Sequence, residues 1–395
     1  MSIRLAVLST HPIQYQAPLF RELGRRRDVD FTALFCDAHG VSPSFDAQFG
    51  KVIRYDVPLL DDYRTRFLSN RAIKPGVRPT GLLNPEILTV LAAGEYDVLV
   101  LHGYNYLTSI LTLLGPRRRT RLILRGESHL RPPRRRLVRA AKRVALPALF
   151  ARADHFLSIG SLNSRYYQAY GVPVEYVTLA PYSVDNRYFS TRAAASLRDV
   201  SAARRRFGLP PRQVLFLVAA KLIEKKRPLD ALLAFATVRS AGADCGLVYV
   251  GDGDLRPALE REIARRHLQN DVLVLGFQNQ SQMPDIYGAC DVLILPSQNE
   301  PWGLVVNEAL ASGMMAIVSD QVGSGVDLVD PSCIFPAGNV PALSSLMCKA
   351  ATESEWLDGH KASSRHRIDC WDIAQTADAF VEGARIALRR PARFL

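Results

Sequence analysis

The sequence has few cysteines and no long apolar run. Six cysteines occur among 395 residues, at positions 36, 245, 290, 333, 348 and 370, and no two have the C-x-x-C spacing of a metal or redox site. We interpret them as reduced thiols and expect no metal. No apolar segment reaches the roughly 20 residues that a bilayer span requires. The first residues read directly as a strand, so we expect no signal peptide and a cytoplasmic protein.

Acidic residues are in the minority, with 38 Asp and Glu against 50 Lys and Arg, for a net charge of +12. This excess fits nucleic acid, an anionic membrane face or phosphorylated substrates as partners. Between residues 117 and 143 arginines are interleaved with leucine, valine and alanine. A solvated face explains any single arginine, whereas the mixture also fits a peripheral contact with the inner face of a membrane. The interleaved aromatics of a nucleic-acid site are missing, so we expect no nucleic acid.

Size and periodicity predict two domains. The chain is 48% hydrophobic and 22% charged, enough to bury full-sized cores. Strand and helix signals alternate through both halves, which favours parallel sheets with right-handed crossovers. We therefore predict an α/β protein with two Rossmann-like, doubly wound domains facing each other across a cleft. Their predicted extents are 1–190 and 191–370. The polar, arginine-rich stretch 186–211 is interpreted as the interdomain linker and the start of the second domain.

Some individual elements have weaker signals. Residues 52–60 are interpreted as a strand, and the turn-rich stretch 63–80 as a mobile loop over a site. Asn84 is expected to cap a helix over 85–94. A long basic helix is expected from about 134 to 152, and the last helix at 371–388.

Polar residues follow several predicted strands of the first half. Ligands of parallel sheets bind at the carboxyl ends of the strands, so we predict a ligand-binding site there. Each of these side chains alone could instead be a satisfied loop residue. The predicted site consists of His11, Gln14, Tyr15, His102, Arg125, Glu127 and His129.

The phrase PSQNEPWGLVVNEAL at 296–310 dominates the second half. An apolar strand at 291–295 precedes it, and 304–311 has helical spacing. Glu300 and Glu308 can accept hydrogen bonds from sugar hydroxyls. The unpaired amides near Trp302, Gly303 and Leu304 favour an anion. The combination suits a sugar joined to a phosphate, and a solvated surface loop is the alternative.

This phrase resembles the E-x7-E motif of the retaining glycosyltransferases of family four, which have the GT-B fold. The resemblance extends over the second half and, in layout, over the first. It implies a UDP- or GDP-linked donor, transfer to a hydroxyl acceptor with retention, and a place in glycan, glycolipid, glycoconjugate or polysaccharide biosynthesis. The acceptor would be a saccharide, a lipid-linked saccharide or a small molecule. No cofactor is implied. Residues 371–395 would pack back onto the first domain.

The resemblance also assigns site residues. Lys221 and Lys226 match the family's basic pair, which stabilises the leaving diphosphate, although arginine is usual at the first position. The turns Gly251-Asp252 and Gly276-Phe277 would surround the base. Asp252-x-Asp254 looks like a D-x-D metal motif, but the family layout places it by the base. The lysines already supply the positive charge that a metal would bring to the diphosphate, so a metal role is not expected.

The resemblance implies that the polar strand-end residues of the first half bind the acceptor, and this side departs from the family pattern. Members usually carry a histidine after the strand that ends at Leu124, and either Glu127 or His129 takes its place here. The expected catalytic residues are therefore Glu300, Lys221, Lys226 and one of these two. A nucleotide-sugar epimerase, a phosphorylase, an inactive scaffold and, remotely, a basic nucleic-acid-binding protein remain as alternatives.

Overall fold

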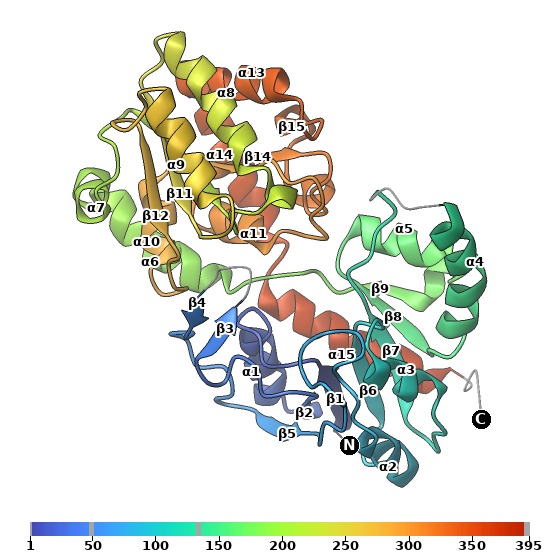
Figure 1. The fold of residues 1–395 in the computed structure, drawn as a ribbon. Helices are drawn as coiled ribbons and strands as arrows, with labels where there is room; N and C mark the ends of the chain where they lie inside the picture. The colour runs from blue at the N-terminus through green and yellow to red at the C-terminus, as the bar shows by residue number, and fades with distance from the viewer. Residues whose placement is uncertain (1, 47–50, 132–135, 391–395) are drawn as a thin grey trace. The chain divides into compact units, whose positions relative to one another are not determined.

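The computed structural model describes residues 2–46, 51–131 and 136–390. The chain forms two compact units, and each is assembled from segments that are far apart in the sequence (Figure 1). Unit 1 consists of Met1–Ser44, Val57–Tyr182 and Ile373–Leu395. Unit 2 consists of Phe45–Asp56 and Ser183–Asp372.

A seven-stranded parallel sheet forms the centre of unit 1, in the order β5-β2-β1-β6-β7-β8-β9. The chain begins in the middle of the sheet, proceeds to one edge and returns to fill the other. Its central strands are apolar because helices cover both faces. The strands are β1 (Ile3–Ser9), β2 (Val29–Phe35), β5 (Arg64–Phe67), β6 (Val98–His102), β7 (Arg121–Arg125), β8 (His155–Ser158) and β9 (Val177–Leu179), and β3 (Ser44–Asp46) pairs with β4 (Lys51–Ile53) separately.

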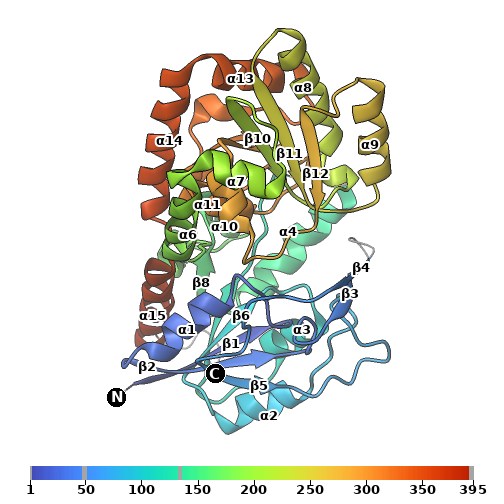
Figure 2. The same cartoon turned by 90° about the vertical axis from the view of Figure 1, so that its left-hand side faces the viewer.

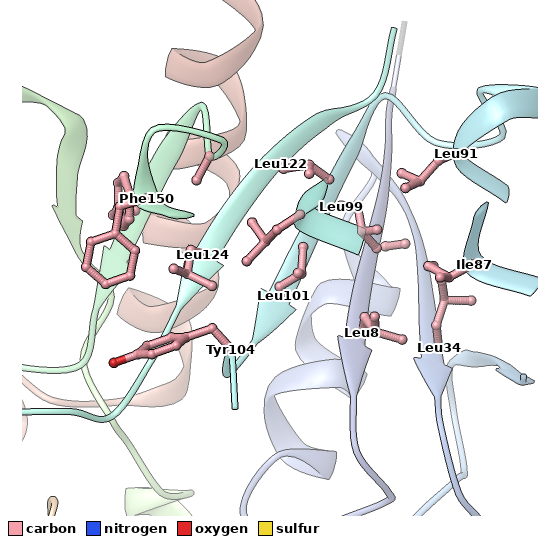
Figure 3. Packing of buried hydrophobic residues seen from close by; sticks show 14 of the residues in the cluster. Leu8, Leu34, Ile87, Leu91, Leu99, Leu101, Tyr104, Leu122, Leu124 and Phe150 are labelled. Carbon is pink, nitrogen blue, oxygen red and sulfur yellow. The ribbon is translucent and has the colours of Figure 1, made fainter. Parts of the chain in front are cut away.

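Alternate side chains of these strands build two cores. Leu99 and Leu101 of β6 join the core under α2, α3 and α4, which Figure 3 shows from close by. Val98 and Val100 point to the opposite face, where α1 and α15 lie side by side (Figure 2). The helices of unit 1 are α1 (Ala17–Arg25), α2 (Glu86–Ala93), α3 (Leu107–Leu114), α4 (Arg136–Phe150), α5 (Ser161–Ala169), α15 (Ile373–Arg389) and the 3-10 turn η1 (Val174–Tyr176).

Unit 2 contains a six-stranded parallel sheet in the order β12-β11-β10-β13-β14-β15. The chain runs outward from β10 to β12 and then crosses back to β13. The strand order therefore reverses between β10 and β13, and such a switch point is where open α/β sheets bind ligands. The strands are β10 (Val214–Ala219), β11 (Cys245–Val250), β12 (Val272–Gly276), β13 (Val292–Leu295), β14 (Met315–Ser319) and β15 (Ile334–Phe335).

Helices cover both faces of this second sheet as well. Both views place α6 beside α10 (Figures 1 and 2), and α8 packs on α13. The predicted α/β fold with two doubly wound, parallel-sheet domains is thereby confirmed. The helices of unit 2 are α6 (Asn186–Arg198), α7 (Val200–Phe207), α8 (Pro228–Ser240), α9 (Arg256–Arg265), α10 (Met283–Ala289), α11 (Leu304–Ala311), α12 (Gly325–Leu328), α13 (Val340–Thr352) and α14 (Ser354–Asp369), with 3-10 turns η2 (Glu224–Lys226) and η3 (Pro331–Cys333).

The predicted linker at 186–211 is wrong. Its residues form α6 and α7, and both helices belong to unit 2. Asp185 and Asp199 cap them by accepting from the amides of Tyr188 and Ala202, each at 2.8 Å. Phe189 of α6 is fully buried. The dense arginines suggested a solvated segment, but most of them occupy the outer faces of two helices, and Arg204 turns inward to pair with Asp291 at 3.0 Å. The sequence reading also overlooked α14.

Three predictions in the first half are corrected. No strand fills 52–60, because β4 ends at Ile53. The stretch 63–80 instead contains β5, which extends the sheet as an edge strand beside β2. Asn84 does not cap α2, since Pro85 occupies the cap position. Its buried amide donates to the carbonyl oxygens of Cys36 and Leu68, at 3.0 and 2.8 Å. Positions 134–135 of the predicted basic helix and positions 391–395 of the predicted C-terminal segment lie outside the described residues.

Candidate active site

The turn between β13 and α11 places the first amides of α11 at the switch point. Gly303 caps the helix with φ 91° and ψ 67°, in the left-handed region that favours glycine. A Cβ at Gly303 would lie 3.1 Å from both the Glu300 Cγ and the Leu295 Cδ2 atoms. The first turn closes with the Val306 amide donating to the Gly303 carbonyl at 2.9 Å. The amides of Leu304 and Val305 precede that bond, so helix geometry gives them no acceptor within the helix. An anion can therefore accept their hydrogen bonds.

The loop before α11 is fastened to the loop after β14. The Gly323 amide donates to the Glu300 carbonyl and the Ser324 amide to the Trp302 carbonyl, both at 3.0 Å. A Cβ on Gly323 would lie 1.9 Å from the Pro301 carbonyl oxygen, so only glycine permits this approach. The two loops therefore form one rigid layer.

Trp302 anchors this layer through its side chain. The indole is buried, stacks on Trp371 with 5.1 Å between ring centroids, and donates to the Asn307 Oδ1 atom at 2.9 Å. Its side chain therefore belongs to the interior. Only the backbone of Trp302 is placed to take part in the predicted anion site.

A cavity of about 220 Å³ lies at the carboxyl ends of the central strands of unit 2. The structure gathers four predicted donor-site residues around it: Lys221, Gly251, Phe277 and Glu308. They come from the segments after β10, β11 and β12 and from α11, which the sequence separates widely. Sequence reasoning missed the rest of the lining, which consists of Ala219, Ala220, Val250, Gln278, Met283, Tyr287 and Val305.

Glu308 is the acidic residue of this cavity. The Tyr287 hydroxyl of α10 donates to the Glu308 Oε2 atom at 2.6 Å. Burial raises the pKa of Glu308 to about 7, and the bond from Tyr287 only partly opposes this. The carboxyl group therefore changes protonation near neutral pH. Tyr287 lies inside an ordinary helical segment, so no sequence signal marked it.

The two glycine turns are joined to each other beside the cavity. The Gly251 amide donates to the Gly276 carbonyl at 2.8 Å. Gly251 has φ 135°, and a Cβ there would lie 2.0 Å from the Ala220 carbonyl oxygen. The Asp252 carboxylate pairs with Arg256 at 3.2 Å, along the start of α9. Gly276 itself has φ 72°. Within the described ranges, no group of three or more His, Cys, Asp or Glu side chains gathers in a way that could hold a metal.

Lys226 and Glu300 form an ion pair across the switch point. The Lys226 Nζ atom contacts the Glu300 Oε2 atom, and both side chains are largely buried. The Gln298 amide donates to the Lys225 carbonyl at 2.8 Å, which ties the loop after β10 to the loop after β13. Neither Lys226 nor Glu300 lines the cavity around Glu308. The ion pair of Lys226 and Glu300 is therefore separate from the four predicted residues that line the cavity.

In unit 1 a polar cluster forms where β1, β6, β7 and β9 end. The Tyr182 hydroxyl contacts the Glu127 carboxylate and lies 3.0 Å from the His102 Nε2 atom. His102 Nε2 is 3.3 Å from Glu127 Oε1, and the Tyr15 and Tyr182 hydroxyls are also 3.3 Å apart. Tyr182 therefore contacts all three of the other residues in the cluster. Sequence reasoning missed it, although its position just after β9 obeys the same strand-end rule.

Two opposing effects act on the acids of this cluster. Desolvation raises the pKa of Glu127, but hydrogen bonds from His102 and Tyr182 and the charges of His102 and Arg125 outweigh it, so the net pKa is lowered. Burial and the Glu127 carboxylate raise the pKa of Tyr182 well above its ordinary value. The cluster therefore pairs an ionised carboxylate with a protonated phenol.

The other predicted acceptor residues occupy different surroundings. Arg125 is buried and donates to the Ala180 and Pro181 carbonyl oxygens at 2.8 and 3.4 Å, so it holds the segment that carries Tyr182. His129 is also buried, whereas Glu127 is partly exposed. The His11 Nδ1 atom lies 2.9 Å from the Thr10 hydroxyl, and burial with the nearby His39 lowers the pKa of His11 to about 4. Gln14, in the same loop, is partly buried.

Comparisons with known proteins agree with this geometry. Residues 199–354, which contain the cavity and the loop before α11, match the family model described as glycosyl transferases group 1. A D-inositol 3-phosphate glycosyltransferase of Xylanimonas cellulosilytica is 30% identical over 237 residues, 57% of this chain and 55% of that protein. A 2-deoxystreptamine glucosyltransferase of Streptomyces kanamyceticus is 30% identical over 178 residues, 44% of each chain. The chain thus spans about half the length of the curated relatives it matches.

Solved structures extend the likeness over the whole chain. Anabaena Alr3699/HepE in complex with UDP and glucose superposes with a TM-score of 0.71 at 17% identity, covering 96% of this chain and 98% of that one. WaaG, a glycosyltransferase involved in lipopolysaccharide biosynthesis, gives a TM-score of 0.66 at 15% identity, covering 97% and 99%. At these identities the likeness shows the fold, which is GT-B. The E-x7-E loop lies inside the segment 199–354 that matches the model of glycosyl transferases group 1, in agreement with the resemblance to the family-four glycosyltransferases.

Proposed function

We propose that this protein is a retaining glycosyltransferase that moves a sugar from a nucleotide diphosphate sugar to a hydroxyl group. The observation that carries the proposal is the cavity of unit 2, where Glu308, Lys221, Phe277 and Val305 meet at the switch point. These groups suit the parts of a nucleotide diphosphate sugar. The carboxylate suits the ribose hydroxyls, the cation and the helix N-terminus suit the phosphates, and the glycine turns suit a flat base. The activities for which the matched relatives are named support the same class.

The donor would lie with its nucleoside in the cavity and its diphosphate toward α11. Glu308 accepts from the ribose hydroxyls, and Gly251 and Gly276 allow the base to approach the backbone. The diphosphate rests against Lys221 and the amides of Leu304 and Val305. UDP is our first choice of nucleotide, because a structural relative was crystallised in complex with UDP.

Lys226 and Glu300 would act at the bond that breaks. Without a ligand, the charges of Lys226 and Glu300 neutralise each other. When the diphosphate binds, it becomes a second anionic partner of Lys226, and Glu300 is then free to bind the sugar hydroxyls. The acceptor oxygen bonds to the anomeric carbon on the face from which the phosphate oxygen departs. That phosphate oxygen takes the acceptor's proton, so a glycoside and a nucleoside diphosphate leave. Positive charge on the departing oxygens lowers the barrier without an enzyme nucleophile or a metal.

The polar cluster of unit 1 would hold the acceptor. Glu127 is its partly exposed carboxylate, held by Tyr182 and His102, and can accept a hydrogen bond from the attacking hydroxyl. We assign the position of the family histidine to Glu127, because His129 is buried. The acceptor is a saccharide, a lipid-linked saccharide or a small molecule.

Ligand-induced thermal shifts with a panel of UDP- and GDP-sugars test the donor assignment, because a ligand that binds the native state raises its apparent stability. We expect one nucleotide series to stabilise the protein and Glu308→Ala to remove the effect. The matched control is Glu355→Ala, an exposed glutamate of the same unit. Absence of a shift with every compound would refute the proposal. Donor consumption without any acceptor would instead identify the epimerase alternative.

A further inference from the structure

Helix α4 presents its apolar side to solvent. Leu137 is 85% exposed and Val144 78% exposed, one helical heptad apart. With 3.6 residues per turn they lie on one face together with Ala140, Ala141 and Ala148, which are also exposed. The side that contacts unit 1 carries the buried Leu146 and Phe150. A surface helix ordinarily turns such a stripe inward, so its outward position calls for a partner.

One edge of this stripe is basic. Arg136 and Arg143 are exposed and lie roughly 100–120° round the helix from Leu137, whereas the exposed Arg139 points further round, toward the side that carries Leu146 and Phe150. Lys142 turns away, donating to the Tyr166 hydroxyl of α5 at 3.1 Å. The sequence contains no Asp or Glu between Glu127 and Asp154, so no neighbouring acid in this stretch neutralises the arginines. Figure 1 shows α4 at the outer side of unit 1, beside α5.

We propose that α4 is a docking surface for an anionic lipid bilayer. The helix lies in the interface plane, with the Leu137–Val144 stripe in the acyl boundary and the arginines at the lipid phosphates. Within the described part of the chain, no helix is both long and apolar enough to cross a membrane. The contact is therefore superficial and reversible, since a short stripe of leucine, valine and alanine buries little area.

Two other occupants fit the surface less well. A second copy of the chain, paired symmetrically through the stripe, would bring the arginines of both copies together, and like charges oppose that contact. Nucleic acid would satisfy the arginines but leave Leu137 and Val144 without a function. The exposed residues of α4 also include no aromatic ring on which a base could stack. A bilayer with anionic headgroups satisfies both the charge and the apolar stripe.

This proposal goes beyond sugar transfer and does not depend on it. One consequence rests on the proposed function: since the proposed acceptor cluster lies in the same unit as α4, a lipid-linked acceptor becomes the favoured class. Vesicle binding needs no sugar transfer, so a failure of either proposal would be recognised separately.

Co-sedimentation with vesicles tests the surface directly. The full chain is mixed with phosphatidylcholine vesicles, with or without about a third of phosphatidylglycerol, at several salt concentrations. We expect binding to the anionic vesicles and a decline with salt. Leu137→Gln with Val144→Gln should lower affinity by about tenfold or more, and Arg136→Gln with Arg143→Gln by about 25-fold, or about fivefold for each charge.

Matched control variants show whether a loss of vesicle binding is specific to α4 or follows from removing any exposed apolar or charged residue. Val174→Gln with Leu179→Gln removes two exposed apolar residues of unit 1 outside α4. Arg205→Gln with Arg261→Gln removes two exposed charges of unit 2. Both control pairs should bind vesicles like the wild type, and the α4 variants should keep the wild-type melting temperature.

Each contrary result overturns the proposal. These results are no binding to anionic vesicles, equal binding to both vesicle types, or α4 variants that bind like the controls. Sedimentation velocity provides one more: a wild-type dimer that the stripe variant dissociates would assign α4 to a second copy. Retention on duplex DNA that only the arginine variant loses would assign it to nucleic acid.

Discussion

Replacing Glu308 with glutamine should make unit 2 more stable at neutral and alkaline pH. Burial raises the pKa of this carboxyl to about 7 from its ordinary 4.5. The amide oxygen of the introduced glutamine could still accept the hydrogen bond that Tyr287 donates at 2.6 Å, so the substitution removes the charge and keeps the contact.

The sign and size follow from proton linkage. Below pH 4.5 both folded and unfolded Glu308 hold their proton, and the group adds no pH dependence. Between about pH 4.5 and 7 only the unfolded chain loses it, so stability falls as pH rises. Above pH 7 the full cost of the buried carboxylate remains. At about 1.36 kcal/mol per pKa unit, the cost is at most roughly 3 kcal/mol, and water entering the cavity reduces it.

Denaturant unfolding followed by tryptophan fluorescence measures this effect. All three tryptophans, at positions 302, 356 and 371, lie in unit 2, so the signal reports on the unit that contains Glu308. The free energy of unfolding of the Glu308→Gln variant minus that of the wild type should grow between pH 4.5 and 7 and then level off. A constant difference from pH 4.5 to 8 would refute a raised pKa.

The same variant tests the donor site. An ionised Glu308 accepts hydrogen bonds from ribose hydroxyls better than the protonated acid does. UDP has a phosphate that also titrates, but this affects both proteins equally. It therefore cancels when the UDP dissociation constant of the Glu308→Gln variant is divided by that of the wild type. That ratio should increase as pH rises through 7. A pH-independent ratio would separate Glu308 from the nucleotide.

Three further predictions concern the other parts of the site. Lys226→Ala should lower kcat by about 100-fold or more, because the leaving diphosphate loses its cation, whereas Lys349→Ala should match the wild type in the same initial-rate assay. Gly303→Ala should destabilise unit 2 by about 1–2 kcal/mol in the fluorescence assay, since a Cβ is strained at φ 91°, and it should weaken UDP binding. Tyr182→Phe should raise the acceptor KM, leave UDP binding unchanged and move the acidic limb of the pH–rate profile upward, because Glu127 loses a bond that lowers its pKa.

These variants have their own controls and contrary outcomes. Gly359→Ala, where a Cβ would meet nothing within 4 Å, controls for a new methyl group in a helix of unit 2. Equal stability of the two alanine variants would remove the strain argument at Gly303. Wild-type turnover in Lys226→Ala would end its assignment to the diphosphate. An unchanged acceptor KM in Tyr182→Phe would place the acceptor elsewhere.

Local sequence determined the elements that carry the donor site. The apolar run before Pro296 forms β13, and the predicted helix over 304–311 is α11 with those same bounds. Gly303 is needed there because the chain adopts a left-handed turn between them. Alternating apolar strands and helices likewise determined the two parallel sheets, since strands buried on both faces must be apolar throughout. These properties depend on residues close together in the chain, and a sequence displays them directly.

Only the tertiary structure decided which side chains meet. Tyr287 reaches Glu308 from a helix 21 residues earlier, and Tyr182 reaches Glu127 from just after β9, 55 residues away. Lys226 pairs with Glu300 because β13 returns beside β10. The structure also shows that the apolar stripe of α4 faces solvent, because the opposite side of the helix packs on unit 1. Such contacts depend on strand order and helix orientation, and the free energy that selects these comes from packing across the whole unit rather than from any one segment.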